Sequence, residues 1–115
     1  MTKVKSKVTK EEKKVRTEEK NEIVLKDFYA KWCAPCKMQD SIIKSLKEKF
    51  GDKVKFETIN IDKESEQADR FKIRAVPTLI IQKNGVVVNR FVGVTSKKIL
   101  EKELNNLLTN KKLSK

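Results

Sequence analysis

The amino-acid sequence predicts an α/β domain in which a mixed β-sheet carries helices on both of its faces. A short apolar run at residues 22–30 is followed at once by a helical pattern at residues 34–50. A second strand and helix are expected over residues 54–71, and a third strand, from residue 78, leads into a hairpin. Strands joined through a helix are parallel neighbours, whereas the hairpin adds antiparallel ones, so the sheet is mixed.

The length and composition indicate one globular domain. The chain has 115 residues, enough for a single hydrophobic core, and 37% of them are hydrophobic, well above the level of a disordered chain. No apolar run approaches the roughly 18 residues of a membrane-spanning helix. The first ten residues also lack the apolar region of a secretory signal. We therefore expect a soluble, cytoplasmic protein with no membrane partner.

The charge of the chain is strongly basic but spread along its length. There are 28 Lys and Arg residues against 16 Asp and Glu, a net charge of +12, and no His. Nucleic-acid-binding proteins usually concentrate their basic residues on one element, so scattered lysines predict no dedicated nucleic-acid site. They favour solubility and general attraction to acidic partners. Without His, proton transfer near neutral pH falls to Cys, Asp, Glu or Lys side chains with a shifted pKa.

Residues 1–22 form a charged lead-in to the domain. Val4, Ser6 and Val8 alternate with lysines, a pattern compatible with a short edge strand. The run Thr9-Lys10-Glu11-Glu12 matches a capping box that would begin a short helix. Val15 is the one apolar anchor of that helix, so a basic arm without fixed structure is an equal alternative.

The first element of the domain itself is a strand within residues 22–30. Its continuous apolar character over so few residues is typical of a strand buried on both faces, although the charged Asp27 lies deep inside it. From residue 34 to residue 50 the apolar residues recur four and seven apart, which predicts a helix. Gly51 then fits the position just after a helix end.

Four further elements are expected: strands at residues 54–61, 78–82 and 86–92, and a short helix at residues 64–71. The dipeptide Asn84-Gly85 favours a tight hairpin turn between the last two strands. Ser96 can cap a final helix, whose leucines share one face: Leu100, Leu104, Leu107 and Leu108. The domain is therefore expected to end at residue 108, before a basic tail at residues 109–115.

The two cysteines, Cys33 and Cys36, lie at the junction between the first strand and its helix. A structural zinc site needs four Cys or His ligands and this chain offers two, so a metal site is not expected. The N-terminus of a helix stabilises a thiolate, which lowers the pKa of Cys33, and Pro35 suits the first turn. Cys36, expected to be the less exposed thiol, is close enough to attack a mixed disulfide formed by Cys33. The alternative is a pair of small buried hydrophobic residues.

Two other positions carry candidate chemistry. A carboxylate inside an apolar strand is costly to desolvate, so burial should raise the pKa of Asp27 and suit it to accept the proton of Cys36. The alternative is a solvated Asp at a strand end. Pro77 opens the third strand. A cis Val76–Pro77 bond would turn the Val76 backbone outward to pair with an extended peptide, whereas a trans proline is the commoner case.

The segment Asp27-Phe28-Tyr29-Ala30-Lys31-Trp32-Cys33-Ala34-Pro35-Cys36-Lys37-Met38 closely resembles the active-site segment of the thioredoxin family. The similarity extends over about residues 22–108, through four further motifs: Asn60-Ile61-Asp62, Val76-Pro77-Thr78, Lys83-Asn84-Gly85 and Val92-Gly93. A Cys-x-x-Cys motif alone is a weak signal, but its combination with the neighbouring Trp and a distant Val-Pro-Thr is specific. The resemblance implies a thioredoxin fold and dithiol–disulfide exchange.

The resemblance also implies roles for individual residues. It makes Cys33 the attacking thiol, Cys36 the resolving thiol, Asp27 the buried acid and Pro77 a cis-proline. The surface that contacts target proteins would comprise Trp32, Ala34, Pro35, Val76, Pro77 and Gly93. Three positions depart from the usual family pattern: Ala34 replaces a more common Gly, Ser41 replaces a mid-helix Pro, and Thr58 stands where many bacterial members have a Lys.

The expected activity is reduction of disulfides in target proteins by a monomer that needs no cofactor beyond its own Cys33–Cys36 disulfide. The glycines are isolated, so no Gly-rich loop can bind a nicotinamide or flavin nucleotide. Electrons must then arrive from a separate thioredoxin reductase, either flavin-dependent or iron–sulfur-dependent. The alternative function is a non-catalytic module that binds acidic partners through the basic surface of the same scaffold.

Overall fold

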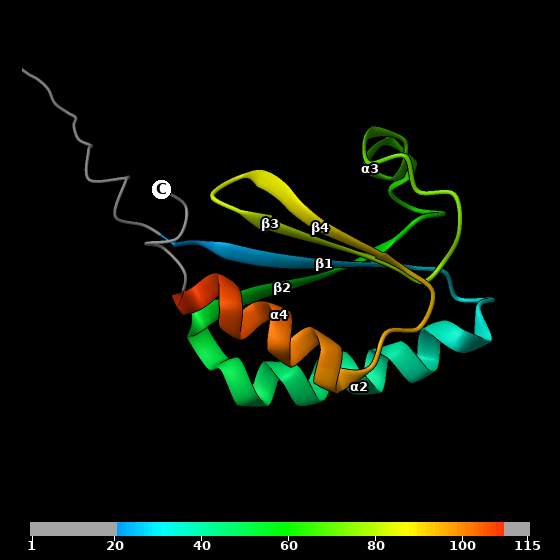
Figure 1. Ribbon diagram of the computed structural model, residues 1–115. Coiled ribbons are helices and arrows are strands. Elements are labelled where there is room, and N and C mark those ends of the chain that lie inside the picture. The colour runs from blue at the N-terminus through cyan, green and yellow to red at the C-terminus, as the bar shows by residue number, and fades with distance from the viewer. Residues whose placement is uncertain (1–20, 110–115) are drawn as a thin grey trace, which may run out of the picture.

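The computed structural model describes residues 21–109, shown in colour in Figure 1. The expected edge strand and capped helix at residues 4–20 lie outside the described residues, as does the tail after residue 109. The division of the chain into a lead-in, a domain at residues 22–108 and a tail therefore stays a prediction.

A four-stranded mixed sheet forms the centre of the molecule, in the order β2-β1-β3-β4. Strand β1 (Ile23–Tyr29) pairs in parallel with β2 (Val54–Asn60) and antiparallel with β3 (Thr78–Lys83). Strand β4 (Val86–Val92) returns beside β3 as a hairpin. The mixed sheet predicted from the sequence is confirmed, and its strands differ from the expected ranges by one residue at a few ends.

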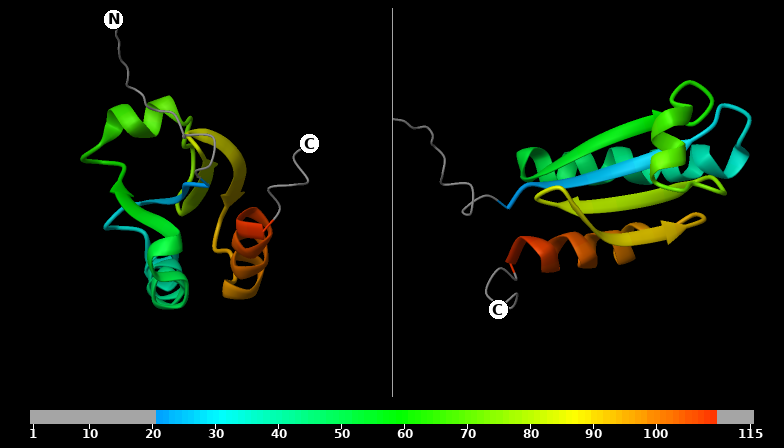
Figure 2. Two further views of the ribbon diagram at one scale, coloured as in Figure 1. Left: turned by 90° about the vertical axis from the view of Figure 1, so that its left-hand side faces the viewer. Right: turned by 90° about the horizontal axis from the view of Figure 1, so that it is seen from above.

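Helices cover both faces of this sheet, as predicted. Helices α2 (Ala34–Phe50) and α4 (Lys97–Thr109) lie side by side on one face, and the short α3 (Ser65–Arg70) lies on the other (Figures 1 and 2). A single 3-10 turn, η2 (Gly51–Lys53), joins α2 to β2. On the α3 side, the Lys26 ammonium connects the sheet to that helix through a 2.8 Å hydrogen bond to the Gln67 side chain.

Local sequence signals account for where these elements begin and end. The Cys33 side chain accepts a hydrogen bond from the Cys36 backbone N–H and so caps the start of α2, and Pro35 lies in its first turn. Gly51 ends α2 with φ +56°, and the Asn84-Gly85 turn has positive φ at both residues, as a tight hairpin requires. Ser96 caps α4, because its hydroxyl accepts the Ile99 N–H at 3.2 Å.

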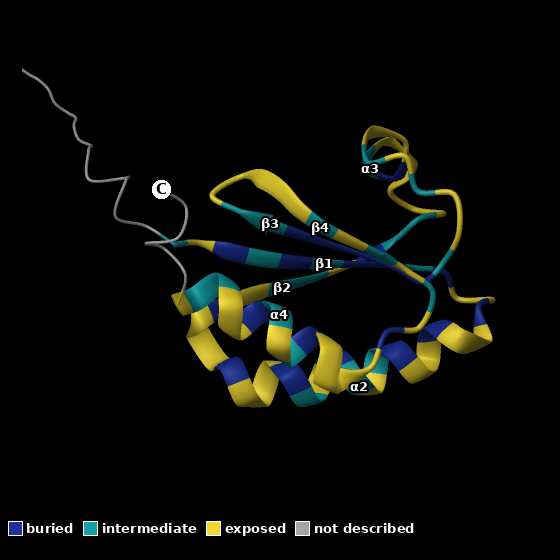
Figure 3. Ribbon diagram, viewed as in Figure 1, coloured by how far each residue is buried: buried dark blue, intermediate teal, exposed yellow. Residues whose placement is uncertain are grey.

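The two faces of the sheet bury separate apolar clusters. Figure 3 marks buried residues along β1, β3, α2 and α4 in dark blue. The larger cluster joins β1, β3, α2 and α4, and includes Ile23, Leu25, Ile43, Leu79, Leu100 and Leu104. The smaller cluster lies toward α3, around Phe28, Ile59 and Ile80. Side chains alternate between faces along a strand, so Asp27 lies on the same face as Ile23 and Leu25. The carboxyl group therefore faces the cysteine-bearing helix.

Candidate active site

The two cysteines form a disulfide at the N-terminus of α2, with their Cα atoms 5.3 Å apart. Cys33 is the N-cap residue, and Cys36 occupies the first turn of the helix. The backbone N–H of Cys36 donates a hydrogen bond to the Cys33 Sγ at 3.2 Å. A thiolate at Cys33 would keep this donor and would also face the positive end of the helix dipole, so the geometry stabilises a negative charge on that sulfur.

Cys36 is, as predicted, the less exposed of the two cysteines, but the margin is small in this oxidised form and Cys33 is itself buried. Cys33 is 5% exposed and Cys36 is 4% exposed. The disulfide holds both sulfurs under a small apolar cluster that contains Ala30, with Tyr29, Ile61 and Val76 packed against it. Exposure therefore hardly distinguishes the two cysteines in this form, and a difference in their reactivity has to come from their electrostatic surroundings.

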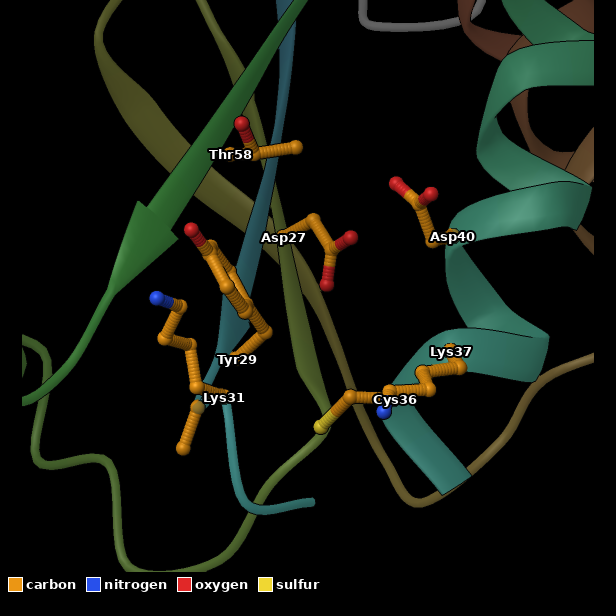
Figure 4. Close-up of a pocket in the computed structure, with 8 residues that line it drawn as sticks. Asp27, Tyr29, Lys31, Cys36, Lys37, Asp40 and Thr58 are labelled. Carbon is orange, nitrogen blue, oxygen red and sulfur yellow. The ribbon is translucent and has the colours of Figure 1, made fainter. Parts of the chain in front are cut away.

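Asp27 is buried beside the disulfide, as the sequence predicts. It is 2% exposed, and it lines a pocket of about 400 Å³ together with Cys36 (Figure 4). Its Oδ1 atom has no hydrogen-bond partner within residues 21–109. Burial, aided by the nearby Asp40 carboxylate and opposed by Lys47, raises the pKa of Asp27 to about 7. A carboxyl with this pKa can both accept and release a proton near neutral pH.

The sequence analysis missed Asp40, a second carboxyl group in the same pocket. Asp40 lies four residues after Cys36 on α2, and the side chains of residues four apart stack on one face of a helix. That spacing was the available signal. Thr58 lines the pocket from β2, and Figure 4 shows it beside Asp27.

A second edge of the site lies across from the cysteines. The Val76 carbonyl oxygen is 3.7 Å from the Cys33 Sγ, and the Val76–Pro77 bond is cis, as expected. The Gly93 N–H donates a 2.8 Å hydrogen bond to the Pro77 carbonyl, which brings the loop after β4 alongside. Gly93 has φ +92°, a conformation that suits glycine. The structure thus brings Val76, Pro77 and Gly93 together beside Cys33.

The remaining predicted contact residues surround the disulfide at the protein surface. Ala34 and Pro35 are exposed on the first turn of α2. Trp32 is 69% exposed, yet its orientation is fixed because the indole N–H donates a hydrogen bond to Asp62 Oδ2 at 2.9 Å. Asp62 belongs to the Asn60-Ile61-Asp62 motif, so this motif supports the tryptophan. The sequence pattern did not indicate that function for it.

A buried amide, Gln39, was also missed. It lies in the apolar stripe of α2 between Cys36 and Ile43 and bonds to the backbone of Thr95.

Among residues 21–109, no group of three or more His, Cys, Asp and Glu side chains is arranged to hold a metal ion. No helix in the same range is long and apolar enough to cross a membrane.

Comparisons with known proteins show which sequences and structures this chain is similar to. Residues 4–106 match the family model described as Thioredoxin. The chain is 38% identical over 86 residues to thioredoxin of Bacillus subtilis, covering 75% of this chain and 83% of that one. It is 40% identical over 85 residues to chloroplastic thioredoxin Y of Oryza sativa, covering 74% and 51%. A mutant thioredoxin from Halobacterium salinarum aligns with a TM-score of 0.71 at 31% identity, covering 76% of each chain.

Proposed function

Because this chain belongs to the thioredoxin family, we propose that Cys33 attacks the disulfide of a target protein and that Cys36 resolves the product. Family membership makes the chain a dithiol–disulfide oxidoreductase, a protein disulfide reductase whose redox group is its own cysteine pair. Like the rest of the family, it works with a reductase and with target proteins that contain disulfides. The roles of individual residues are our proposal.

The proposed reaction transfers two electrons from the cysteine pair to the target. The Cys33 thiolate attacks one sulfur of the target disulfide, the target S–S bond breaks, and the first target cysteine leaves as a thiolate. Cys36, having lost its proton, then attacks the Cys33 sulfur of the mixed disulfide. The Cys33–Cys36 bond forms, and the second target cysteine leaves. The target is reduced, and the cysteine pair is oxidised.

The observation that carries this assignment is the position of the pair on α2. Cys33 caps the helix and keeps the N–H of Cys36 at 3.2 Å from its sulfur, so its thiolate has a hydrogen-bond donor and the helix dipole. Cys36 lies in the pocket that Asp27 also lines, so a carboxyl of pKa about 7 is available to accept its proton. The two thiols thus receive different electrostatic support, which matches the two different roles.

We place the target on the surface around Cys33. The Val76 carbonyl lies 3.7 Å from the Cys33 sulfur, and Gly93 is hydrogen-bonded to the neighbouring Pro77, which suits an extended peptide that pairs with backbone groups beside the sulfur. Pro77 holds this edge, and Trp32, Ala34 and Pro35 supply exposed contact area next to it. The reductase that returns electrons would use this same surface, because it must reach the same sulfur.

We further propose a cytoplasmic monomer that receives its electrons from a flavin-dependent or iron–sulfur-dependent reductase. A reductase of protein disulfides works where thiols are kept reduced, as they are in the cytosol. The name of the rice relative shows that a similar domain also occurs in chloroplasts. Localisation of the tagged full chain, and reduction of its disulfide by each purified reductase type in turn, test these assignments.

The test of the function is reduction of insulin disulfides with dithiothreitol as the electron donor. The parent chain should accelerate precipitation of the insulin B chain, and a Cys33→Ser, Cys36→Ser double variant should not. A Cys36→Ser variant should accumulate a mixed disulfide with its target, because the resolving thiol is missing. If the double variant retained the biological effect of the parent, the alternative of a non-catalytic basic binding module would be favoured.

A further inference from the structure

Gln39 is a fully buried amide in the middle of an apolar helix face. Its exposed fraction is 0%, and the other buried residues of α2 include Cys36, Ile43 and Leu46. Its side chain makes two hydrogen bonds to one distant residue: Nε2 donates to the Thr95 carbonyl at 3.0 Å, and Oε1 accepts the Thr95 N–H at 2.7 Å. The amide therefore fixes the backbone of the loop after β4 to the helix that carries the cysteines.

We propose that Gln39 is a positioning residue that sets the distance between the cysteine pair and the target-binding edge formed by Val76, Pro77 and Gly93. The inference rests on the function proposed above, since it concerns how that same edge is held. Both hydrogen bonds of the Gln39 side chain go to Thr95, so its proposed role is indirect. It acts through Thr95 and the loop, which determine where the Gly93 backbone meets an incoming peptide.

A continuous series of hydrogen bonds connects Gln39 to that edge. The Thr95 hydroxyl donates to the Gly93 carbonyl at 3.1 Å, and the Gly93 N–H donates to the Pro77 carbonyl at 2.8 Å. The neighbouring Val76 carbonyl lies 3.7 Å from the Cys33 Sγ. The loop is thus bonded to Pro77 at one end and to α2 at the other. The positions of both sides of the target-binding edge are therefore fixed relative to the same helix.

The chemistry of Gln suits this purpose, and an apolar residue cannot replace it. A primary amide presents one donor and one acceptor side by side, which match the C=O and N–H of a single backbone residue. Thr95 is itself only 8% exposed, so without Gln39 both of its backbone groups would lose their partners in a buried place. The loop would then shift toward water to satisfy them, and Gly93 would move with it.

This arrangement predicts a split between large and small substrates. An extended protein segment must pair with the Val76 and Gly93 backbone at the same time, so its binding depends on the position of the loop. A small symmetric disulfide such as hydroxyethyl disulfide needs only the Cys33 sulfur. Loss of Gln39 should therefore weaken reaction with protein disulfides and leave reaction with the small disulfide nearly unchanged.

The experiment compares Gln39→Leu with Ile43→Val. Leu has a similar length and no amide, whereas Ile43→Val loosens the same buried helix face and keeps the Gln39 amide. For Gln39→Leu we expect the KM for insulin to rise about tenfold, with kcat and the rate with hydroxyethyl disulfide changed less than about twofold. Ile43→Val should change none of the three. Thr95→Ala, which keeps the backbone bonds but loses the hydroxyl, should raise the KM less.

Amide hydrogen exchange gives a second readout that does not depend on turnover. The Thr95 N–H should exchange faster in Gln39→Leu than in the parent, while amides in the middle of β3 stay protected. An insulin KM that rises equally in Ile43→Val, or a parallel loss with the small disulfide, would overturn the proposal. A parent chain inactive on insulin would overturn the proposed function as well, whereas an active parent with an unaffected Gln39→Leu would overturn this inference alone.

Discussion

The side chains of Asp27 on β1 and Asp40 on α2 line one pocket, which Cys36 also lines (Figure 4). Asp27 is buried, whereas Asp40 is half-exposed and pairs with Lys44 at 3.4 Å. Two carboxyl groups so placed repel each other when both are ionised, which favours the protonated form of the buried one. Thr58, which also lines the pocket, is uncharged, so it does not offset the repulsion.

Replacing Asp27 by Asn should stabilise the folded protein, and the gain should grow with pH. Burial raises the pKa of Asp27 from 3.8 in the unfolded chain to about 7 in the folded one. The folded state therefore holds the proton more tightly, and the parent loses stability as the pH rises between about 4 and 7. The full difference corresponds to roughly 4 kcal/mol as an upper estimate.

Urea unfolding of the oxidised proteins at a series of pH values measures this difference. The Asp27→Asn variant and the parent should have similar stability near pH 4 and diverge until about pH 7. A constant gap between Asp27→Asn and the parent at every pH would contradict a raised pKa.

The same substitution should slow the second chemical step. If Asp27 accepts the proton of Cys36, its loss should reduce the rate of release from the mixed disulfide by on the order of a hundredfold. The first attack by Cys33 should be affected far less, because Cys33 is supported by the helix N-terminus instead. Rapid acid quenching followed by mass spectrometry separates the two steps, and equal slowing of both would reject the assigned role.

Removing the Asp40 charge should lower the pKa of Asp27. The Asp40→Asn variant deletes the repulsion but leaves the burial, which is the larger cause, so the pKa should fall yet stay above its ordinary value. Lys47→Gln removes an attraction and should move the pKa the opposite way. Carboxyl carbon chemical shifts followed through a pH titration report both changes, and shifts of the same sign would show that the two charges do not act on Asp27.

Alkylation of the reduced protein should modify Cys33 before Cys36. The Cys33 sulfur caps α2 and faces the N–H of Cys36, which favours its thiolate near neutral pH. Cys36 has the partly ionised Asp27 in its pocket, which opposes a second negative charge. Limiting iodoacetamide near pH 7 and peptide mass mapping give the order, and preferential labelling of Cys36 would reverse the two roles.

Truncating Trp32 should impair target reduction without unfolding the protein. The indole is 69% exposed, and its fixed contact is the hydrogen bond to Asp62. For Trp32→Ala we expect the insulin KM to rise severalfold, with a melting temperature close to that of the parent. Asp62→Ala keeps the indole but removes its hydrogen-bond partner, so it should have a smaller effect in the same direction. An unchanged KM in both variants would remove Trp32 from the contact surface.

Much of the fold was predictable because local residues encode it. The ends of α2, the Asn84-Gly85 turn and the Ser96 cap each depend on backbone preferences of one or two residues. The ends of other elements shifted slightly, since they depend on tertiary contacts. Residue 61 was expected in β2, for example, but the strand ends at Asn60, although the Ile61 N–H still bonds to the carbonyl of Tyr29 at the end of β1.

Site features that depend on a local sequence motif could be predicted. Features that depend on packing between distant residues could not. The burial of Asp27 followed from the apolar strand around it. The burial of Cys33 did not, because it depends on Val76, forty-three residues away, as well as on the disulfide itself. Gln39 stood out only as a polar residue in an apolar stripe, and its partner Thr95 comes from a loop that no local pattern connects to α2.

The place of β1 in the sheet has a consequence for synthesis of the chain. Both neighbours of β1 follow it in the sequence, and the second of them, β3, ends only at Lys83. While the ribosome adds the roughly fifty residues after Cys33, a few seconds to about ten seconds of translation, the strand lacks one or both partners. During that interval both cysteines are thiols of an unfinished nascent chain. Until β3 has been synthesised and has paired with β1, cellular oxidants can therefore reach the cysteines of the unfolded chain.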